Sequence, residues 1–243
     1  MTQALLFGGI GTLLETSELQ RAAFNAAFVE AGLDWHWRED EYRAMLQTPG
    51  GIKRIVDFAR RQGNVDIDER AAAELHANKS RLFHERLAAG QLQARPGVLR
   101  LVRGCRENGI ALGFATTTYA ATAQAVLTAI GLSSADFDVI MHRSLVENAK
   151  PDGEVYTRCL AALRVDAQQA LAVEDSESGL ASAAAAGVPC IVTPGTNTST
   201  QDFSAALTIV SHLGDIGNPY RWLGGAQPGT VDVIEFNSWL DAA

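Results

Sequence analysis

The most constraining feature of this sequence is a short apolar run that stops at a cluster of glycines. Ala4-Leu5-Leu6-Phe7 is followed by Gly8-Gly9-Ile10-Gly11-Thr12. This pattern is typical of a buried strand and a tight loop, because glycine lets the backbone turn sharply or approach a ligand closely. Ligands of open α/β sheets bind just beyond the carboxyl ends of the strands. We therefore expect the functional site near the Gly8–Gly11 loop.

The second part of the chain alternates between helical and strand patterns. Apolar periodicity predicts strands over 110–115, 137–141, 170–173 and 189–192, preceded by helices over 98–107, 120–130, 154–163 and 178–186. Such alternation is typical of βαβ units and a parallel sheet. Residues 16–90 show helical patterns only. The predicted fold is therefore α/β, a Rossmann-like parallel sheet with an inserted all-helical cap domain.

The same patterns predict the domain boundaries. Residues 1–15 and 91–216 are expected to form the α/β core, residues 16–90 the helical cap, and residues 217–243 a C-terminal tail. Within that tail, 231–239 fits a strand or a helix equally well. At the start of the cap, Ser17 and Gln20 have the spacing of a capping box, with Ser17 as the N-cap.

Composition limits the classes of function. The chain has 243 residues, of which 47% are hydrophobic, enough for a sizeable core, and its apolar runs are too short to span a bilayer. The formal net charge of −8 argues against a nucleic-acid partner. The chain begins Met-Thr-Gln rather than with a basic signal-peptide start, so we expect a cytoplasmic protein with no membrane partner. The three widely spaced cysteines lack metal-ligand spacing and are expected to be reduced and buried.

Chemically useful side chains follow the ends of the predicted core strands. Thr116 and Thr117 follow the strand at 110–115, Lys150 lies in the loop after 137–141, and Glu174-Asp175 follow 170–173. Each alone is explained by a turn, a solvated charge or a helix N-cap. Together, at one edge of a sheet, they suit a phosphate and a hard cation such as Mg²⁺. We predict that Thr116, Thr117 and Lys150 bind phosphate and that Glu174 and Asp175 bind metal.

These motifs resemble those of the haloacid dehalogenase superfamily. Gly11-Thr12-Leu13 matches the end of motif I, Thr116 the motif II hydroxyl, Lys150 the motif III lysine and Glu174-Asp175 the motif IV carboxylates. Glu174-Asp175-Ser176 with Gly179 resembles the branch whose helical cap follows motif I. The resemblance implies Mg²⁺-dependent phosphoryl transfer through an aspartyl nucleophile.

Within that branch, the sequence is most similar to the CbbY-type sugar-bisphosphate phosphatases and the β-phosphoglucomutases. The resemblance rests on Phe24-Asn25, on Thr116 with its neighbours, and on Gly50, Gly51 and Arg54. It implies a sugar-phosphate substrate, over which the cap closes, and a specificity loop in the cap that contains Gly50, Gly51 and Arg54.

The sequence departs from the family pattern in motif I, which reads Asp-x-Asp-Gly-Thr. Gly8 stands where the family keeps its nucleophile, and Ile10 stands where it keeps its general acid/base. Gly8 has no group that can attack phosphorus, and Ile10 cannot transfer a proton. Gln20 and Ile52 also stand where relatives often have His and Lys. We expect the usual chemistry to be lost and Mg²⁺ binding to be weak or absent.

Three functions fit this combination of features. The first is an inactive phosphatase relative that binds a phosphorylated small molecule, such as a sugar phosphate, or a partner protein. The second is an active phosphohydrolase that uses water held by Thr116, Glu174 or Asp175. The third is an interaction protein with a relic pocket. We favour the first, and it predicts phosphate binding without Mg²⁺ by Lys150, Thr116 and a nest of backbone N–H groups in the Gly8–Thr12 loop.

Overall fold

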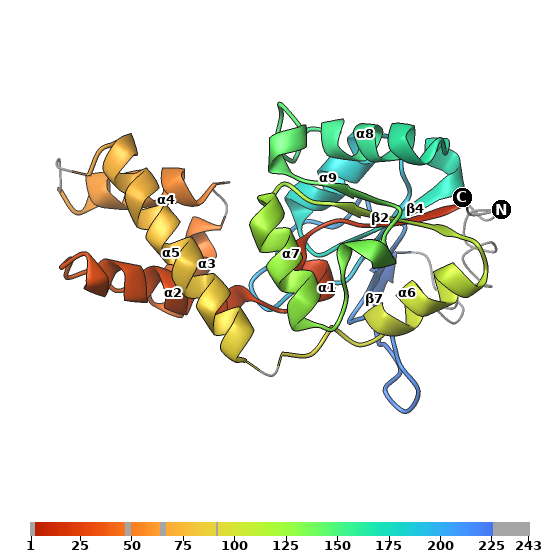
Figure 1. The fold of residues 1–243 in the computed structure, drawn as a ribbon, viewed down its shortest axis with the longest axis horizontal. Coiled ribbons are helices and arrows are strands. Elements are labelled where there is room, and N and C mark those ends of the chain that lie inside the picture. Colours follow the sequence, from red (N-terminus) through yellow and green to blue (C-terminus); the bar gives the residue numbers. More distant parts are fainter. Residues whose placement is uncertain (1–2, 47–49, 64–66, 91, 226–243) are drawn as a thin grey trace. The chain divides into compact units, whose positions relative to one another are not determined.

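The contacts of the chain divide it into two units. The computed structural model describes residues 3–46, 50–63, 67–90 and 92–225. One unit comprises Met1–Glu15 with Gln91–Ala243, and the other comprises Thr16–Gly90. The first contains a largely parallel sheet with helices, and the described part of the second contains helices only (Figure 1). The predicted fold class is therefore confirmed.

The core is built on one seven-stranded sheet with the order β3-β2-β1-β4-β5-β6-β7. β1 pairs in parallel with both β2 and β4, and only the β6–β7 pair is antiparallel. β1 is thus an interior strand of the sheet, and the loop that follows it lies between the loops after β2 and β4, at the carboxyl ends of the parallel strands. The strands are β1 (Ala4–Phe7), β2 (Ala111–Ala115), β3 (Val139–Met141), β4 (Ala170–Glu174), β5 (Cys190–Val192), β6 (Thr208–Val210) and β7 (Trp222–Gly225).

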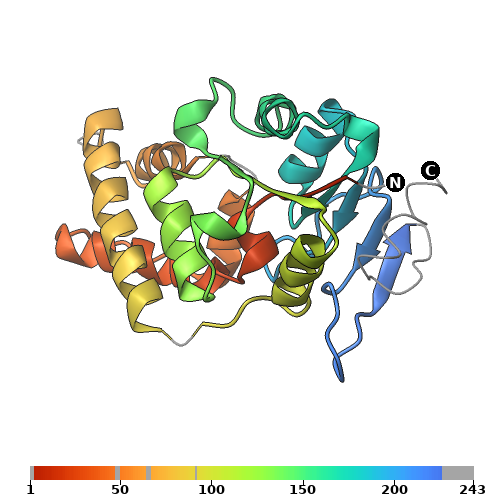
Figure 2. The ribbon, with the colours of Figure 1, turned by 45° about the vertical axis from the view of Figure 1, so that its right-hand side comes forward.

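Helices cover both faces of this sheet. Figures 1 and 2 show α8 and α9 on one face and α6 and α7 on the other. Leu6 packs in the cluster that contains Cys159 of α8, whereas the ring of Phe7 meets Phe137 at 6.4 Å. A strand buried on both faces is apolar throughout, which explains the continuous run at 4–7. The helices are α1 (Ile10–Leu13), α6 (Val98–Glu107), α7 (Ala120–Ala129), α8 (Glu154–Leu163) and α9 (Glu177–Ala185).

Two core strands were not predicted from the sequence. β6 has only three residues, and β7 lies in the segment assigned to a tail of undetermined structure. Three of the four residues of β7 are exposed, so the segment lacks the apolar character of the central strands. The undecided prediction for 231–239 falls outside the described residues.

The helical unit has an aromatic core. Phe24, Phe28, Trp37, Tyr42 and Phe58 are buried in one cluster, and the rings of Phe24 and Trp37 lie 4.6 Å apart. The helices are α2 (Ser17–Glu30), α3 (Glu39–Met45), α4 (Gly51–Arg61) and α5 (Glu69–Ala89).

The predicted capping box at the start of α2 is wrong. Ser17 is the first helical residue and Thr16 is the N-cap. The amide oxygen of Gln20 accepts a hydrogen bond from Lys79 of α5 instead of returning to the helix end. A tertiary contact has taken the place of the local one, because Gln20 faces the neighbouring helix.

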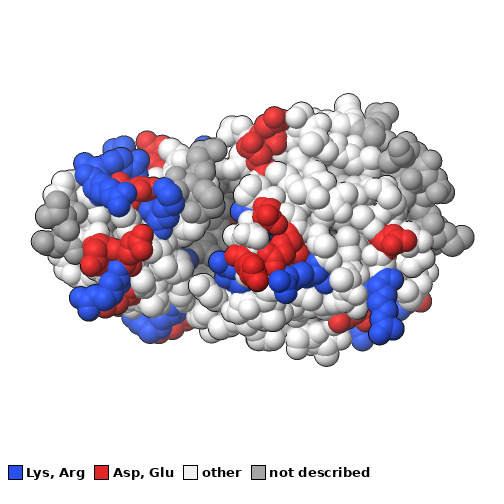
Figure 3. Space-filling model, turned by 90° about the horizontal axis from the view of Figure 1, so that it is seen from above, with Lys and Arg blue, Asp and Glu red and all other residues white. Residues whose placement is uncertain are grey.

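One face of the molecule carries charged side chains of both signs. On the face shown in Figure 3, basic and acidic side chains are interspersed and form no extended basic surface of the kind that nucleic acid requires. No helix within the described ranges has the length and apolar character needed to cross a membrane.

Candidate functional site

The pairing of β1 with β4 brings the glycine loop beside the carboxylates of Glu174 and Asp175. Phe7 is opposite Val173 in the parallel register, and the N–H of Gly8 donates to the Val173 carbonyl at 2.9 Å. Glu174 ends β4, and Asp175 follows it directly. Because both strands end at the same edge, residues 8–12 and 174–175 form one group although they are far apart in sequence.

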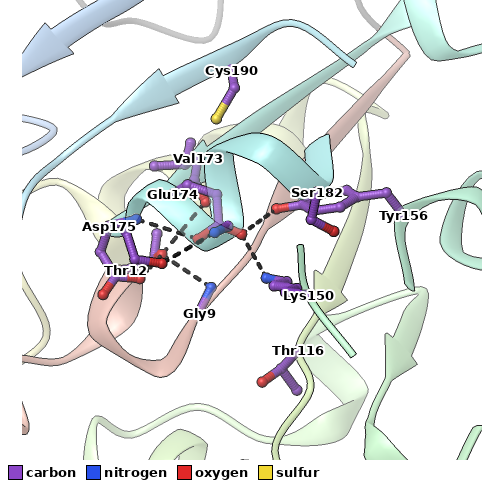
Figure 4. Close-up of polar contacts among 12 residues, drawn as sticks. Gly9, Thr12, Thr116, Lys150, Tyr156, Val173, Glu174, Asp175, Ser182 and Cys190 are labelled. Carbon is purple, nitrogen blue, oxygen red and sulfur yellow. Dashed lines mark hydrogen bonds and ion pairs between the residues drawn. The ribbon is translucent and has the colours of Figure 1, made fainter. Parts of the chain in front are cut away.

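A buried ion pair lies at the centre of this group. The Nζ atom of Lys150 is 2.5 Å from Oε1 of Glu174, and the hydroxyl of Tyr156 donates to the same oxygen at 2.7 Å (Figure 4). The Glu174 side chain has no exposed surface, and that of Lys150 is 9% exposed. Burial and the charge of Glu174 raise the pKa of Tyr156 well above its ordinary value, so this hydroxyl stays protonated. The extra hydrogen bond helps to offset the cost of burying the two charges.

The carboxylate of Glu174 occupies the space that a side chain at position 8 would need. A Cβ atom built on Gly8 would lie 2.5 Å from the Tyr156 hydroxyl oxygen and closer still to Oε1 of Glu174. No real Cβ atom has such neighbours, so any side chain at this position requires Glu174 to move. Gly8 has no side chain, and the Glu174 carboxylate fills the space that one would occupy.

Asp175 makes the second contact with the glycine loop. Its Oδ1 accepts a hydrogen bond from the Thr12 hydroxyl at 3.2 Å, and a Cβ atom on Gly9 or Gly11 would overlap its oxygens. Burial, and next the charge of Glu174, raise the pKa of Asp175 to about 6. Two carboxylates and one ammonium group therefore face this loop.

The predicted backbone nest in the Gly8–Thr12 loop is wrong for three of its donors. The N–H of Gly8 bonds to Val173, that of Gly9 to the Thr12 hydroxyl at 3.2 Å, and that of Thr12 to the Gly9 carbonyl. These groups are already used inside the fold and are not directed at a ligand. The positive charge beside this loop is that of Lys150, which is paired with Glu174.

The predicted motif II hydroxyl lies beside the cluster. Thr116 follows β2 and is 2% exposed, and its Oγ1 accepts a hydrogen bond from the N–H of Thr118 at 3.2 Å. Figure 4 shows Thr116 near Lys150, with no hydrogen bond to the other residues drawn. Thr117 is the next residue and is half-buried. The structure therefore supports the turn explanation for Thr116 and places it at the predicted edge.

The predicted cap residues lie together within the helical unit. Gly50 is the N-cap of α4, with a φ of +89° that favours glycine, and Gly51 packs so closely on His76 that a Cβ atom would overlap the imidazole. The guanidinium carbon of Arg54 lies 5.9 Å from the centre of the Phe24 ring.

The donor set does not fit a resident Mg²⁺ ion. Among the described residues, no group of three or more His, Cys, Asp or Glu side chains is placed to hold a metal. Oε1 of Glu174 is occupied by Lys150 and Tyr156, and Ile10 has no oxygen to offer. Mg²⁺ is usually held by one or two carboxylates together with waters and phosphate oxygens, and one of the two carboxylates here, that of Glu174, is already paired with Lys150.

Two residues of the site were not expected from the sequence. Tyr156 lies on the apolar face of α8 and has the pattern of a core residue. Arg95 donates hydrogen bonds of 2.7–3.1 Å to four backbone carbonyls, and so ties the glycine loop to the segments after β5 and β6. Those carbonyls belong to Gly11, Thr193, Pro194 and Ser211. Neither role has a local sequence signal.

Comparison with known proteins places these features in a family. A model of haloacid dehalogenase-like hydrolases matches residues 11–193, a span that begins after Gly8 and Ile10. The plasmid-encoded protein CbbY of Cupriavidus necator is 38% identical over 247 residues, which covers 98% of this chain and 96% of that protein.

Solved structures agree with this result. The crystal structure of CbbY from Rhodobacter sphaeroides in complex with phosphate has a TM-score of 0.82 and 37% identity, covering 89% of this chain and 97% of that one. A variant of the same protein in complex with xylulose-(1,5)bisphosphate has the same scores and coverage.

Proposed function

The chain belongs to the haloacid dehalogenase-like hydrolase family, and on this basis we propose that it binds a phosphorylated small molecule without hydrolysing it through an aspartyl-phosphate intermediate. One observation carries the proposal. The carboxylate of Glu174 fills the side-chain space of Gly8 and pairs with Lys150. At the position where the family has its nucleophile, this chain therefore has no side chain, and the Glu174 carboxylate occupies the space that one would need.

The chemistry of the remaining groups favours binding over turnover. Glycine and isoleucine offer neither a nucleophile nor a proton at positions 8 and 10. Glu174 is a poor substitute nucleophile, because it has no exposed surface and its Oε1 already accepts from two donors. Lys150 remains as a cation, and a phosphate oxygen that replaces Glu174 as its partner would form a charge-assisted hydrogen bond.

The ligand class follows from the relatives. CbbY of Rhodobacter sphaeroides binds phosphate, and its variant binds xylulose-(1,5)bisphosphate. We propose a sugar phosphate for this chain, with Lys150 and Thr116 as phosphate ligands. Because the donor set does not fit Mg²⁺, no metal takes part in the proposed binding.

The test combines a turnover assay with calorimetry. We expect no hydrolysis of p-nitrophenyl phosphate above the blank, and binding of xylulose-1,5-bisphosphate in the presence of chelator. Lys150→Met should weaken this binding about 10–100-fold, since a hydrogen bond to a charged group contributes ~1.5–3 kcal/mol. The matched control is Lys53→Met, an exposed lysine of α4 paired with Asp57.

Three results would replace this proposal. Turnover that disappears in Glu174→Gln would establish hydrolysis by a different nucleophile. Absence of binding to wild-type protein, or binding unchanged in Lys150→Met, would favour an interaction protein with a relic pocket.

A further inference from the structure

The carboxylate of Glu174 is held by donors on both of its oxygens. Oε1 accepts from the Nζ atom of Lys150 at 2.5 Å and from the hydroxyl of Tyr156 at 2.7 Å (Figure 4). Oε2 accepts from the N–H of Asp175 at 3.3 Å. A buried carboxylate that accepts three hydrogen bonds is a satisfied group, so the fold keeps it in place without a ligand.

Two glycines make room for this carboxylate. A Cβ atom built on Gly8, in the loop after β1, would overlap its Oε1, and one built on Gly179, in α9, would overlap both of its oxygens. The carboxylate therefore lies between two backbone segments that carry no side chain at this point. Because Oε1 is the oxygen that pairs with Lys150, the absence of a side chain at position 8 is what permits this ion pair.

The charge of Lys150 is offset inside the fold. Its side chain is 9% exposed, and among the described residues its ion pair is with Glu174. Its Nζ atom also lies 5.1 Å from the centre of the ring of Tyr156, the residue whose hydroxyl holds the same carboxylate. The ammonium group that an anion would approach thus has a carboxylate at hydrogen-bond distance already.

An anion that binds Lys150 has to compete with this carboxylate. An ammonium group that is already neutralised gains little from a second anion, and two anions at one cation repel each other. Removing the carboxylate, by contrast, leaves a buried ammonium group without a partner, which is unfavourable in a protein interior. Any anion that reaches Lys150 then relieves this cost and should bind more tightly.

We propose that Glu174 is an internal anion that keeps Lys150 in a state of low phosphate affinity, and that Gly8 allows this by carrying no side chain. The proposal rests on the function proposed above, in which Lys150 receives the phosphate. Glu174→Gln and Gly8→Ala should therefore both increase the affinity for phosphate. Both should also lower the stability of the ligand-free protein, since each disturbs the buried pair.

Calorimetry of the full chain with inorganic phosphate, in the presence of chelator, measures this effect. Glu174→Gln keeps the size of the side chain and removes its charge. We expect it to bind phosphate at least about tenfold more tightly than wild type, since a hydrogen bond to a charged group typically changes affinity by about 10–100-fold. Glu107→Gln is the matched control: it removes the same charge from an exposed position at the end of α6 and should leave the affinity unchanged.

Two further variants separate the ion pair from the overall charge. Gly8→Ala keeps every charge and displaces only the carboxylate of Glu174, so it should raise the affinity as well. It also provides a second variant if Glu174→Gln does not fold. In a Lys150→Met background, Glu174→Gln should lose its gain, as a coupling between residues in contact.

Three results would overturn the proposal: a phosphate affinity of Glu174→Gln equal to or below that of wild type, a gain that persists in the Lys150→Met background, or a Gly8→Ala protein that binds no more tightly than wild type. The function proposed above fails in a different way. Phosphate binding to Glu174→Gln without measurable binding to wild type would refute that function and support the internal anion. Wild-type binding that depends on Lys150, with no gain in Glu174→Gln, would do the reverse.

Discussion

Because the Glu174 carboxylate occupies the space beside Gly8, we predict that Gly8→Ala destabilises the fold. The added Cβ atom would overlap the carboxylate of Glu174 and lie 2.5 Å from the Tyr156 hydroxyl oxygen. Glu174 must then move away from Lys150, in a pair where one side chain is fully buried and the other is 9% exposed. Overpacking alone costs about 1–3 kcal/mol, and disturbing a buried pair adds to this. We expect a loss of about 2–3 kcal/mol in the free energy of unfolding.

Urea unfolding followed by circular dichroism measures this loss, with an unchanged m value as the sign of a stability effect. For a chain of this size the melting temperature should fall by roughly 5–10 °C. The control is the same substitution in a Glu174→Ala background, where the space is vacated. There we expect the cost of Gly8→Ala to drop by at least about 1 kcal/mol, as a coupling between residues in contact.

The reasoning would be refuted by a Gly8→Ala protein within about 0.5 kcal/mol of wild type, the range of ordinary surface substitutions. An equal cost in both backgrounds would also refute it, because the effect would then not pass through Glu174.

Three further predictions concern buried polar groups. Arg95→Met should lower the free energy of unfolding in urea by about 3–5 kcal/mol, because it leaves four carbonyl oxygens without their donor. Arg106→Met, which breaks an exposed ion pair with Asp136, is the control and should lower it by no more than about 1 kcal/mol. Burial lowers the pKa of Lys79 from 10.5 in the unfolded chain to about 7 in the folded chain. The free energy of unfolding should therefore rise between these two pH values, by up to about 4–5 kcal/mol. Unfolding measured as a function of pH should show that Lys79→Met removes this rise. Tyr156→Phe removes the 2.7 Å hydrogen bond to Glu174 and should lower the melting temperature by roughly 2–6 °C in calorimetry, corresponding to about 1–2 kcal/mol, while an unchanged value would show that this bond contributes nothing.

The sequence predicted the architecture well because its signals are local. The bounds of α6 and α8 agree with the predicted ranges at both ends, since apolar periodicity and flanking glycines act within a few residues. The central strands were recognisable because burial on both faces makes them apolar throughout. β6 and β7 lacked that signal, because short and exposed strands depend on their pairing partners.

The sequence also identified the residues at the strand ends, since parallel strands bring their carboxyl ends to one edge. It could not show that Glu174 fills the space of Gly8, because these residues are joined only by the β1–β4 register. Gln20 illustrates the same limit: its spacing from Ser17 predicted a local cap, and its actual partner is Lys79, on another helix.

The sequence by itself thus determined the α/β class and the family pattern. Only the tertiary structure decided what occupies the space beside Gly8 and which donors hold Glu174. The physical reason is that periodicity and turn chemistry act over a few residues, whereas buried charge is governed by contacts between segments that only folding brings together.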